Sequence, residues 1–180
     1  MPIAINGSGT VTGVSVGGLP DGIVDRDTLA TLAKGSILQV VQNSFSTQTS
    51  LNSTSYIDTG LTATITPSAT SSKVLVLGWM QVSSSLFSDP EYVYGYGFNI
   101  VRGSTEIKSG SGLQYYQAIA DSDISYSVFN RPHNFSFLDS PNTTSATTYK
   151  IQAKEEDINA SLQINNSSET SEMILIEVAA

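Results

Sequence analysis

Alternating hydrophobic and polar residues predict β-strands over most of the chain beyond residue 35. The segment 147–155, TTYKIQAKE, alternates throughout, and the segment 61–67, LTATITP, alternates until its proline. A period of two residues is typical of a strand with one face in a core and the other in water. Further segments with strand-like patterns are 36–43, 91–109, 123–130, 134–139 and 171–179.

One of the predicted strands is apolar on both faces. The main apolar face of the segment 73–82, KVLVLGWMQV, consists of Val74, Val76, Met80 and Val82. Its opposite face carries three further large side chains, Leu75, Leu77 and Trp79. In the segment 171–179 one face is shared by Ile174, Ile176 and Val178. A strand with one face in water does not have the pattern of 73–82, so the second face of that segment needs a cover. Contact with another copy of the chain is one explanation.

These segments together predict an all-β fold. Eight or more short strands are separated by Ser, Thr, Asn and Gly turns, and no alternation of strands with helices is visible. The segment 91–109 is predicted to be a hairpin that turns at Arg102-Gly103-Ser104. A β-sandwich of the jelly-roll kind fits this spacing best, and we expect it to occupy residues 36–180.

Residues 1–35 have a different composition and are predicted to form an arm outside the sandwich. Seven of the 14 glycines lie at or before Gly35, and the spaced apolar residues are too few to build a core. The segment 25–34, DRDTLATLAK, predicts one short helix with Asp25 as its N-cap and Gly35 after its end. A helix of fewer than three turns is marginal in water, so another element must pack on Leu29 and Leu32.

Charge and composition exclude several classes of function. The chain has 16 acidic and 8 basic residues, and its net charge of −8 argues against binding to nucleic acid or anionic membranes. No apolar run is long enough to span a membrane. The N-terminus lacks the pattern of a signal peptide, so export through a cleaved leader is not expected. There is no cysteine for disulfides or thiolate metal sites.

The candidate chemical motifs are weak. The segment 13–17, GVSVG, matches the pattern of a serine nucleophile elbow, but the following Gly-Leu-Pro cannot begin the helix that this motif needs. His133 is expected in a loop between two strands, with no evident catalytic partners. Asp121, Asp123 and the acids at 155–157 lack the glycine spacing of a calcium loop and are interpreted as solvated loop acids. We therefore predict no enzymatic activity, no cofactor and no metal.

A row of tyrosines in the segment YVYGYGF is the most notable group of side chains. One strand face holds Tyr92, Tyr94, Tyr96 and Phe98, and Tyr115 and Tyr116 lie on the next segment. Exposed tyrosines stack on sugar rings and are favoured at binding surfaces, so the five tyrosines are candidate receptor-binding residues. The alternative is that they belong to the core or to a subunit contact, with Gly95 and Gly97 allowing close approach of a neighbouring strand.

Several blocks in order along the chain resemble a known family. They are INGSGTVTGVSVGGLPDGIVD, TSYIDTGLTATITPSATSSKVLVL, NIVRGSTEIKSG, FLDSPNTTSATTYKIQ and MILIEVAA. The chain resembles the tail-fibre-like or capsid-associated structural proteins of bacteriophages of marine and cyanobacterial hosts. The resemblance implies a homotrimeric jelly-roll head, distantly similar in shape to tumour necrosis factor domains. It also implies attachment to the virion through the N-terminal segment, after synthesis in the host cytoplasm.

The arm then has a use as a virion anchor. An extended glycine-rich segment can add a strand to another virion protein while its alternate side chains fill pockets. The candidate anchoring residues are Ile3, Ile5, Val11, Val14, Val16 and Leu19. The helix at 25–34 is expected to form a three-helix collar, so the candidate trimer contacts are Leu29, Leu32 and Trp79.

Two functions of different kinds fit these expectations. The first is a short trimeric tail fibre or knob that contacts the host surface, with surface polysaccharide as a candidate ligand. The second is a capsid decoration protein that binds no receptor. A polysaccharide depolymerase is disfavoured, because it needs paired carboxylates on a concave face and the acids here lie mostly in predicted turns.

Overall fold

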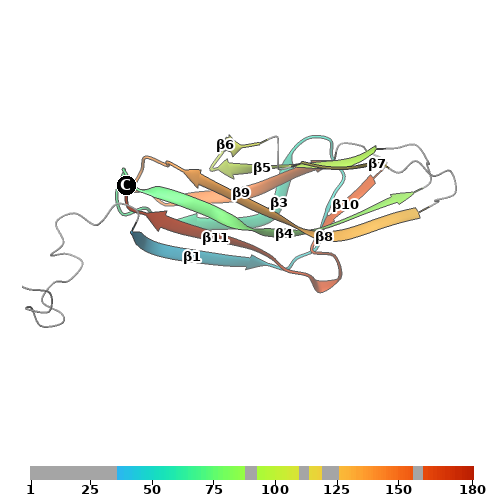
Figure 1. Cartoon of the computed structure of the whole chain (residues 1–180), viewed down its shortest axis with the longest axis horizontal. Coiled ribbons are helices and arrows are strands. Elements are labelled where there is room, and N and C mark those ends of the chain that lie inside the picture. The colour runs from blue at the N-terminus through green and yellow to red at the C-terminus, as the bar shows by residue number, and fades with distance from the viewer. Residues whose placement is uncertain (1–35, 88–92, 110–113, 119–125, 156–159) are drawn as a thin grey trace, which may run out of the picture. The chain divides into compact units, whose positions relative to one another are not determined.

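The computed structural model describes residues 36–87, 93–109, 114–118, 126–155 and 160–180. The chain divides into two units, Met1–Lys34 and Gly35–Ala180, and the described residues belong to the second. They form two antiparallel β-sheets that pack face to face as a sandwich (Figure 1). The prediction of an all-β sandwich in this part of the chain is confirmed. The predicted arm and its helix at 25–34 lie outside the described residues.

The first sheet has six strands, and its central strand is β4, Lys73–Phe87. One edge of β4 pairs with β11 (Ser171–Val178) and then with β10 (Ala160–Ile164). The other edge of β4 pairs along nearly its whole length with β8, Tyr126–Asp139. The sheet is completed by β1 (Ile37–Phe45) on β11 and β2 (Thr49–Leu51) on β10.

The second sheet has five strands. At its centre β9, Thr147–Glu155, pairs with β5, Val93–Arg102. The other edge of β9 pairs with β3, Ile57–Ile65. The other edge of β5 pairs with β6 (Thr105–Lys108) and β7 (Gln114–Ala118). A single 3₁₀ turn at Asn166–Ser168 joins β10 to β11 in the first sheet.

The strand pairs are nested along the chain. The first strand, β1, pairs with the last, β11, and β3 pairs with β9 in the same way. Inside these pairs β4 pairs with β8, and β5 pairs with β7 at the centre. In the described residues, each strand of the first half of the fold is therefore paired with a strand of the second half, and such pairs occur in both sheets.

Burial alternates along the strands as the sequence predicts. In β9 every second residue from Thr147 to Glu155 is buried, and the residues between them are exposed or half-buried; β11 alternates between buried and half-buried. The core between the sheets includes Leu61, Val76, Met80, Ile151 and Leu175. In β4 the predicted main face, Val74, Val76, Met80 and Val82, is buried in this core. Its opposite residues Leu75, Leu77 and Trp79 are only half-buried, so the predicted division of this strand is confirmed.

The structure corrects several boundaries and adds three strands. The strand predicted at 61–67 is β3 at Ile57–Ile65, and the strand predicted at 73–82 continues to Phe87. The predicted segments 123–130 and 134–139 are parts of a single strand, β8, which continues through Pro132. Among the described strands β8 pairs only with β4, and an edge strand accommodates a proline that lacks an N–H. His133 therefore lies within a strand and not in the expected loop. The added strands β2, β7 and β10 are short.

The predicted hairpin at 91–109 is present. Arg102 pairs with Thr105, so Gly103 and Ser104 form a two-residue loop between β5 and β6. Gly103 has a φ of +60°. A turn with its first loop residue in this region favours glycine, because other residues are strained there.

Candidate functional site

The outer side of the six-stranded sheet carries an apolar row that crosses four strands. The pairing of β1, β11, β4 and β8 places Val40 opposite Ile176, Ile176 opposite Leu75, and Leu75 opposite Leu138. All four side chains face away from the core, because their neighbours Val41, Leu175, Val76 and Phe137 face it. The strands are therefore in a register that joins four apolar residues into one continuous row.

The next row on the same side is half apolar. Here Ile174 of β11 lies opposite Leu77 of β4, with Gln42 and Ser136 on the two outer strands. We call the set Val40, Leu75, Leu77, Leu138, Ile174 and Ile176 the outer apolar face. Beyond it the following row is more polar, with Ser44, Glu172, Trp79 and Asn134.

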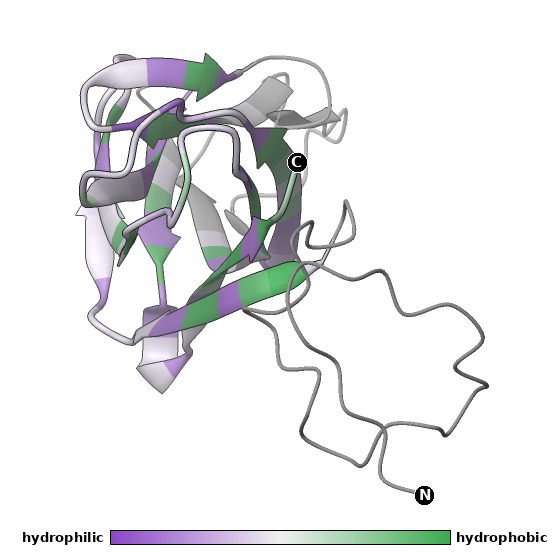
Figure 2. Ribbon diagram, turned by 90° about the vertical axis from the view of Figure 1, so that its left-hand side faces the viewer, coloured by the Kyte–Doolittle hydropathy of each residue, from purple (hydrophilic) through white to green (hydrophobic). Residues whose placement is uncertain are grey.

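The outer apolar face is open to water at both edges of the sheet. Val40 is 57% exposed and Leu138 is 49% exposed. Beside them Ile37, at the start of β1, is 54% exposed. One further large hydrophobic residue is exposed among the described residues, Ile57, at 37%. In Figure 2 the start of β1, where it joins the grey trace, is coloured as strongly hydrophobic. Exposed apolar area is thus concentrated on one side of one sheet.

The outer side of the five-stranded sheet is polar along β3 and β9. Along β3 and β9 the outward residues include Thr62, Thr64, Thr148, Lys150 and Gln152. The hydroxyls of Thr64 and Thr148 lie 2.8 Å apart across the strand pair. The hydroxyl of Thr62 donates a 2.9 Å hydrogen bond to the carbonyl oxygen of Tyr149. This surface is suited to contact with water.

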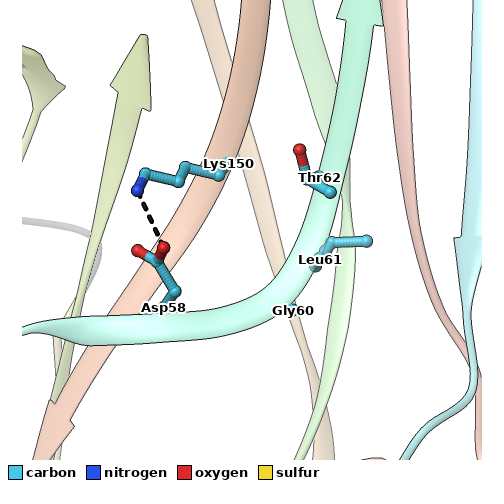
Figure 3. A pocket seen from close by; sticks show the side chains of 5 residues that line it. All are labelled: Asp58, Gly60, Leu61, Thr62 and Lys150. Carbon is cyan, nitrogen blue, oxygen red and sulfur yellow. Dashed lines mark hydrogen bonds and ion pairs between the residues drawn. The ribbon is translucent and has the colours of Figure 1, made fainter. Parts of the chain in front are cut away.

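A shallow pocket of about 180 Å³ lies where β3 bends (Figure 3). The register of β3 against β9 shifts between Asp58 and Thr62, and Gly60 in this bulge has a φ of +96°. Lys150 Nζ donates a 2.8 Å hydrogen bond to the Asp58 carboxylate, and Gln152 donates one of 2.7 Å. These two bonds hold the pKa of Asp58 below its ordinary value. Because both carboxylate oxygens already have partners, the pocket does not present a free acid or base.

A second pocket of about 400 Å³ lies beside the Arg102 hairpin. Arg102 forms an ion pair of 2.7 Å with Asp139, and the Tyr149 hydroxyl donates a 2.8 Å hydrogen bond to the same carboxylate. Burial, followed by the hydrogen bond to Asp139, raises the pKa of Tyr149. The hydroxyl therefore stays protonated at neutral pH. This group links β5, β8 and β9 at one end of the sandwich.

Among the candidate receptor-binding tyrosines, Tyr96 has its side chain described, and it is buried. Tyr96 is 2% exposed, and its ring lies 5.0 Å from that of Phe98 and 5.8 Å from that of His133. It therefore belongs to the core, which was the alternative interpretation of the tyrosine row. The side chains of Tyr92, Tyr94, Tyr115 and Tyr116 lie outside the described residues.

His133 completes this aromatic cluster between the sheets. Its ring is 4.7 Å from that of Phe98. Burial lowers the pKa of His133. The His133 imidazole therefore packs as a core side chain on two aromatic rings, and the interpretation that it is not catalytic stays a prediction.

The remaining predicted site residues are only partly described. Trp79, a candidate trimer contact, is half-buried on the outer side of the six-stranded sheet, and its indole N–H donates a 3.2 Å hydrogen bond to the Thr170 carbonyl oxygen. The other candidate trimer contacts, Leu29 and Leu32, lie outside the described residues. The same is true of the six candidate anchoring residues Ile3, Ile5, Val11, Val14, Val16 and Leu19.

One of the predicted loop acids is not solvated. Glu155, at the end of β9, is 1% exposed, and its carboxylate accepts a hydrogen bond from the backbone N–H of Leu162. Asp121 and Asp123 lie outside the described residues. In the part of the chain that the structure covers, no group of three His, Cys, Asp or Glu side chains is arranged to hold a metal. No helix within that part is long and apolar enough to cross a membrane.

Comparison with known proteins gives distant likenesses in structure only. No family profile and no curated protein matches the sequence. Over 83% of this chain the fold is similar to 14% of dimeric latent PorU from Porphyromonas gingivalis, with 9% identity and a TM-score of 0.39. Over 89% of this chain it is similar to 44% of a chain in the structure of the infectious bursal disease virus Gx strain, with 12% identity and a TM-score of 0.27. The chain therefore spans less than half of each of these chains.

Proposed function

We propose that this chain is a non-enzymatic structural subunit of a bacteriophage virion. In this proposal residues 36–180 form a homotrimeric jelly-roll head, and residues 1–35 hold it to the particle as an arm. The most favoured role is a short tail fibre or knob that contacts the host surface. The arm binds another virion protein, and the head is exposed on the extracellular particle.

The nested strand pairing is the observation that carries the proposal. Pairing of β1 with β11, β3 with β9, β4 with β8 and β5 with β7 is what a jelly roll requires. Jelly rolls are a common architecture of viral capsid and lectin domains. A fold alone does not determine a function, so the resemblance of the sequence blocks to phage structural proteins is the second support.

The described surfaces fit a structural role. The two pockets contain an ion pair or carboxylate whose oxygens are already bonded, and neither presents a nucleophile beside a base. One outer side of the sandwich is polar and the other is apolar. A subunit that packs against its own copies while facing water elsewhere has this division.

The alternative role, capsid decoration, is separated from a fibre by position and copy number. Antibody labelling of intact particles by electron microscopy, combined with quantitative mass spectrometry, measures both. We expect a few labelled positions on the tail and a low copy number. Labelling that follows the capsid lattice would favour decoration, and absence from purified particles would refute the virion assignment.

Substitutions in the arm test its role as the anchor. We expect the pair Val14→Asp and Val16→Asp to reduce incorporation into particles more than tenfold, because buried pockets reject charged side chains. The matched control is the pair Ser8→Asp and Thr10→Asp, which adds the same charge at polar positions outside the candidate anchoring residues and is expected to leave incorporation within twofold. Incorporation is measured by mass spectrometry of particles purified from cells that supply the variant. Equal incorporation of both pairs would show that the apolar positions are not the anchor.

A further inference from the structure

The outer apolar face is not covered by any described strand. The four strands that carry it, β1, β11, β4 and β8, form the lower layer of the sandwich in Figure 1, and no labelled element lies beneath them. The four residues in the middle of its rows, Leu75, Leu77, Ile174 and Ile176, are half-buried in the single chain. A single exposed apolar side chain needs no explanation, but a continuous row across four strands marks an interaction site.

The charge of the chain indicates what kind of partner this face accepts. The net charge of the protein is −8, so two copies of it repel one another at long range. The two rows of the outer apolar face contain Val40, Gln42, Ile174, Ile176, Leu75, Leu77, Ser136 and Leu138, and none of these ionises. Two acidic copies meet at least electrostatic cost on a face without acids. A basic partner would instead be attracted to the acidic surfaces.

The place where the N-terminal arm joins the head supports the same partner. The backbone N–H of Ala179 donates a 2.9 Å hydrogen bond to the carbonyl oxygen of Ser36, and Ile37 pairs with Val178. The arm therefore leaves the head at the end of the sheet where the outer apolar face lies. Copies joined through this face start their 35-residue arms close to one another, as a shared anchor requires.

We propose that the outer apolar face of the six-stranded sheet is the surface through which copies of this chain associate. The occupant of the face is a second copy of the head, and the polar row with Glu172 and Asn134 lies at the margin of the contact. This inference rests on the proposed trimeric subunit and assigns the sheet and the residues by which the trimer is held.

The first test compares two charged substitutions on the same strand. Leu138→Glu places a carboxylate in the apolar row of β8, and Asn134→Glu places one on the same side of β8, four residues away and outside the two rows. Both residues are exposed in the single chain, so neither change disturbs the core. The mass of the full-length protein is measured by light scattering over a range of concentrations, with circular dichroism to verify folding.

The wild-type protein and Asn134→Glu are expected to have the mass of three chains. Leu138→Glu is expected to remain folded and to associate at least tenfold more weakly. Full association of Leu138→Glu, or equal weakening by both changes, would overturn the assignment of this face. A wild-type protein that is monomeric at every concentration would overturn the assignment as well. This outcome is also the one expected if the arm covers the face of its own head.

The second test does not depend on weakening the assembly. The chain has no cysteine, so single introduced thiols report on local access. Ser136→Cys lies in the second row of the outer apolar face, whereas Thr64→Cys lies on the polar outer side of β3. In the associated protein we expect a maleimide to modify Cys at position 136 at least tenfold more slowly than at position 64. Equal rates would refute the proposed contact.

These measurements use the isolated protein, so their outcome is separate from that of the virion experiments. A protein found in particles but monomeric in solution would retain the virion role and lose this interface. A trimer held by this face but absent from particles would retain the interface and lose the virion role.

Discussion

The two outer sides of the sandwich are built from the same kind of strand and have opposite surfaces. On the five-stranded sheet the outward residues of β3 and β9 include threonines that bond to one another or to the backbone, and a lysine and a glutamine that bond to Asp58. On the six-stranded sheet the outward residues Val40, Ile176, Leu75 and Leu138 form an apolar row. The two sides do not differ in how their strands form, because on both sheets the outward residues alternate with residues of a buried inner face.

Both sheets have an apolar inner face, so only their outward residues indicate which side of the sandwich is suited to contact with a partner. Threonine is as good a strand former as valine, and it faces water without cost. Selecting isoleucine and leucine at Ile174, Ile176, Leu75 and Leu77 instead adds nothing to the core of a single chain. The part of these side chains that the single chain leaves exposed is stabilised only when another surface removes it from water.

The largest expected effect comes from comparing two neighbouring residues on opposite sides of β11. Leu175 is fully buried, so Leu175→Ala is expected to lower the free energy of unfolding by about 2–5 kcal/mol. This loss does not depend on protein concentration. Ile174 faces outward, so Ile174→Ala is expected to lower stability mainly at concentrations at which the wild-type protein is associated. Urea unfolding at two protein concentrations checks both, and a concentration-independent loss for Ile174→Ala would remove the distinction between the two sides.

A smaller effect is expected from the histidine that lies between the two sheets. Burial lowers the pKa of His133 in the folded state, so the unfolded chain, with a pKa near 6.5, takes up a proton first. Stability is therefore expected to decrease as the pH falls from 7.5 to 5.5, because protonation favours the unfolded state.

The control for this prediction is His133→Phe, which keeps an aromatic ring against Tyr96 and Phe98 and does not titrate. Urea unfolding at both pH values is the measurement. The pH range ends above the values at which carboxylates such as Asp58 and Glu177 become protonated, so these groups contribute little. The same loss of stability in both proteins would show that His133 is not its source.

The smallest effect is expected on the polar side. Lys150→Met removes the ion pair with Asp58, whose side chain is 54% exposed. Exposed ion pairs contribute about 0–1 kcal/mol, so the free energy of unfolding should change by less than about 1 kcal/mol. The mass in solution should be unchanged, because this side is not in the proposed contact. A shift to larger assemblies would show that the polar side also takes part in association once its charge is removed.

Much of the sandwich could be predicted from the sequence, because alternation is a local signal. The strand β9 was predicted at 147–155 with the bounds that the structure has, since every second residue of TTYKIQAKE is buried. The strand β10, ASLQI, was missed because it is short and lies beside the polar segment that follows β9. In β8 the proline at 132 suggested two segments, but the strand lies at an edge and continues through it.

The candidate interaction surface could be predicted only in part. The apolar second face of β4 is predicted from Leu75 and Leu77, and Ile174 and Ile176 are predicted only to share one face of β11. Val40 and Leu138 were missed, because each is a single apolar residue whose importance depends on which residues lie across the strand pair. Register between strands far apart in the chain is set by the whole fold, so no local pattern shows it.

The nested pairing also determines when the outer apolar face is first complete during synthesis of the chain. The strand β1 has no partner in its sheet until β11 has been synthesised, and roughly 125 residues separate the two strands. At about 5–20 residues per second, a ribosome needs on the order of ten seconds to make that stretch. The row that begins at Val40 and continues through Ile176 does not exist before β11 has been made. Association through the proposed contact face therefore has to wait until β11 has been synthesised and has paired with β1.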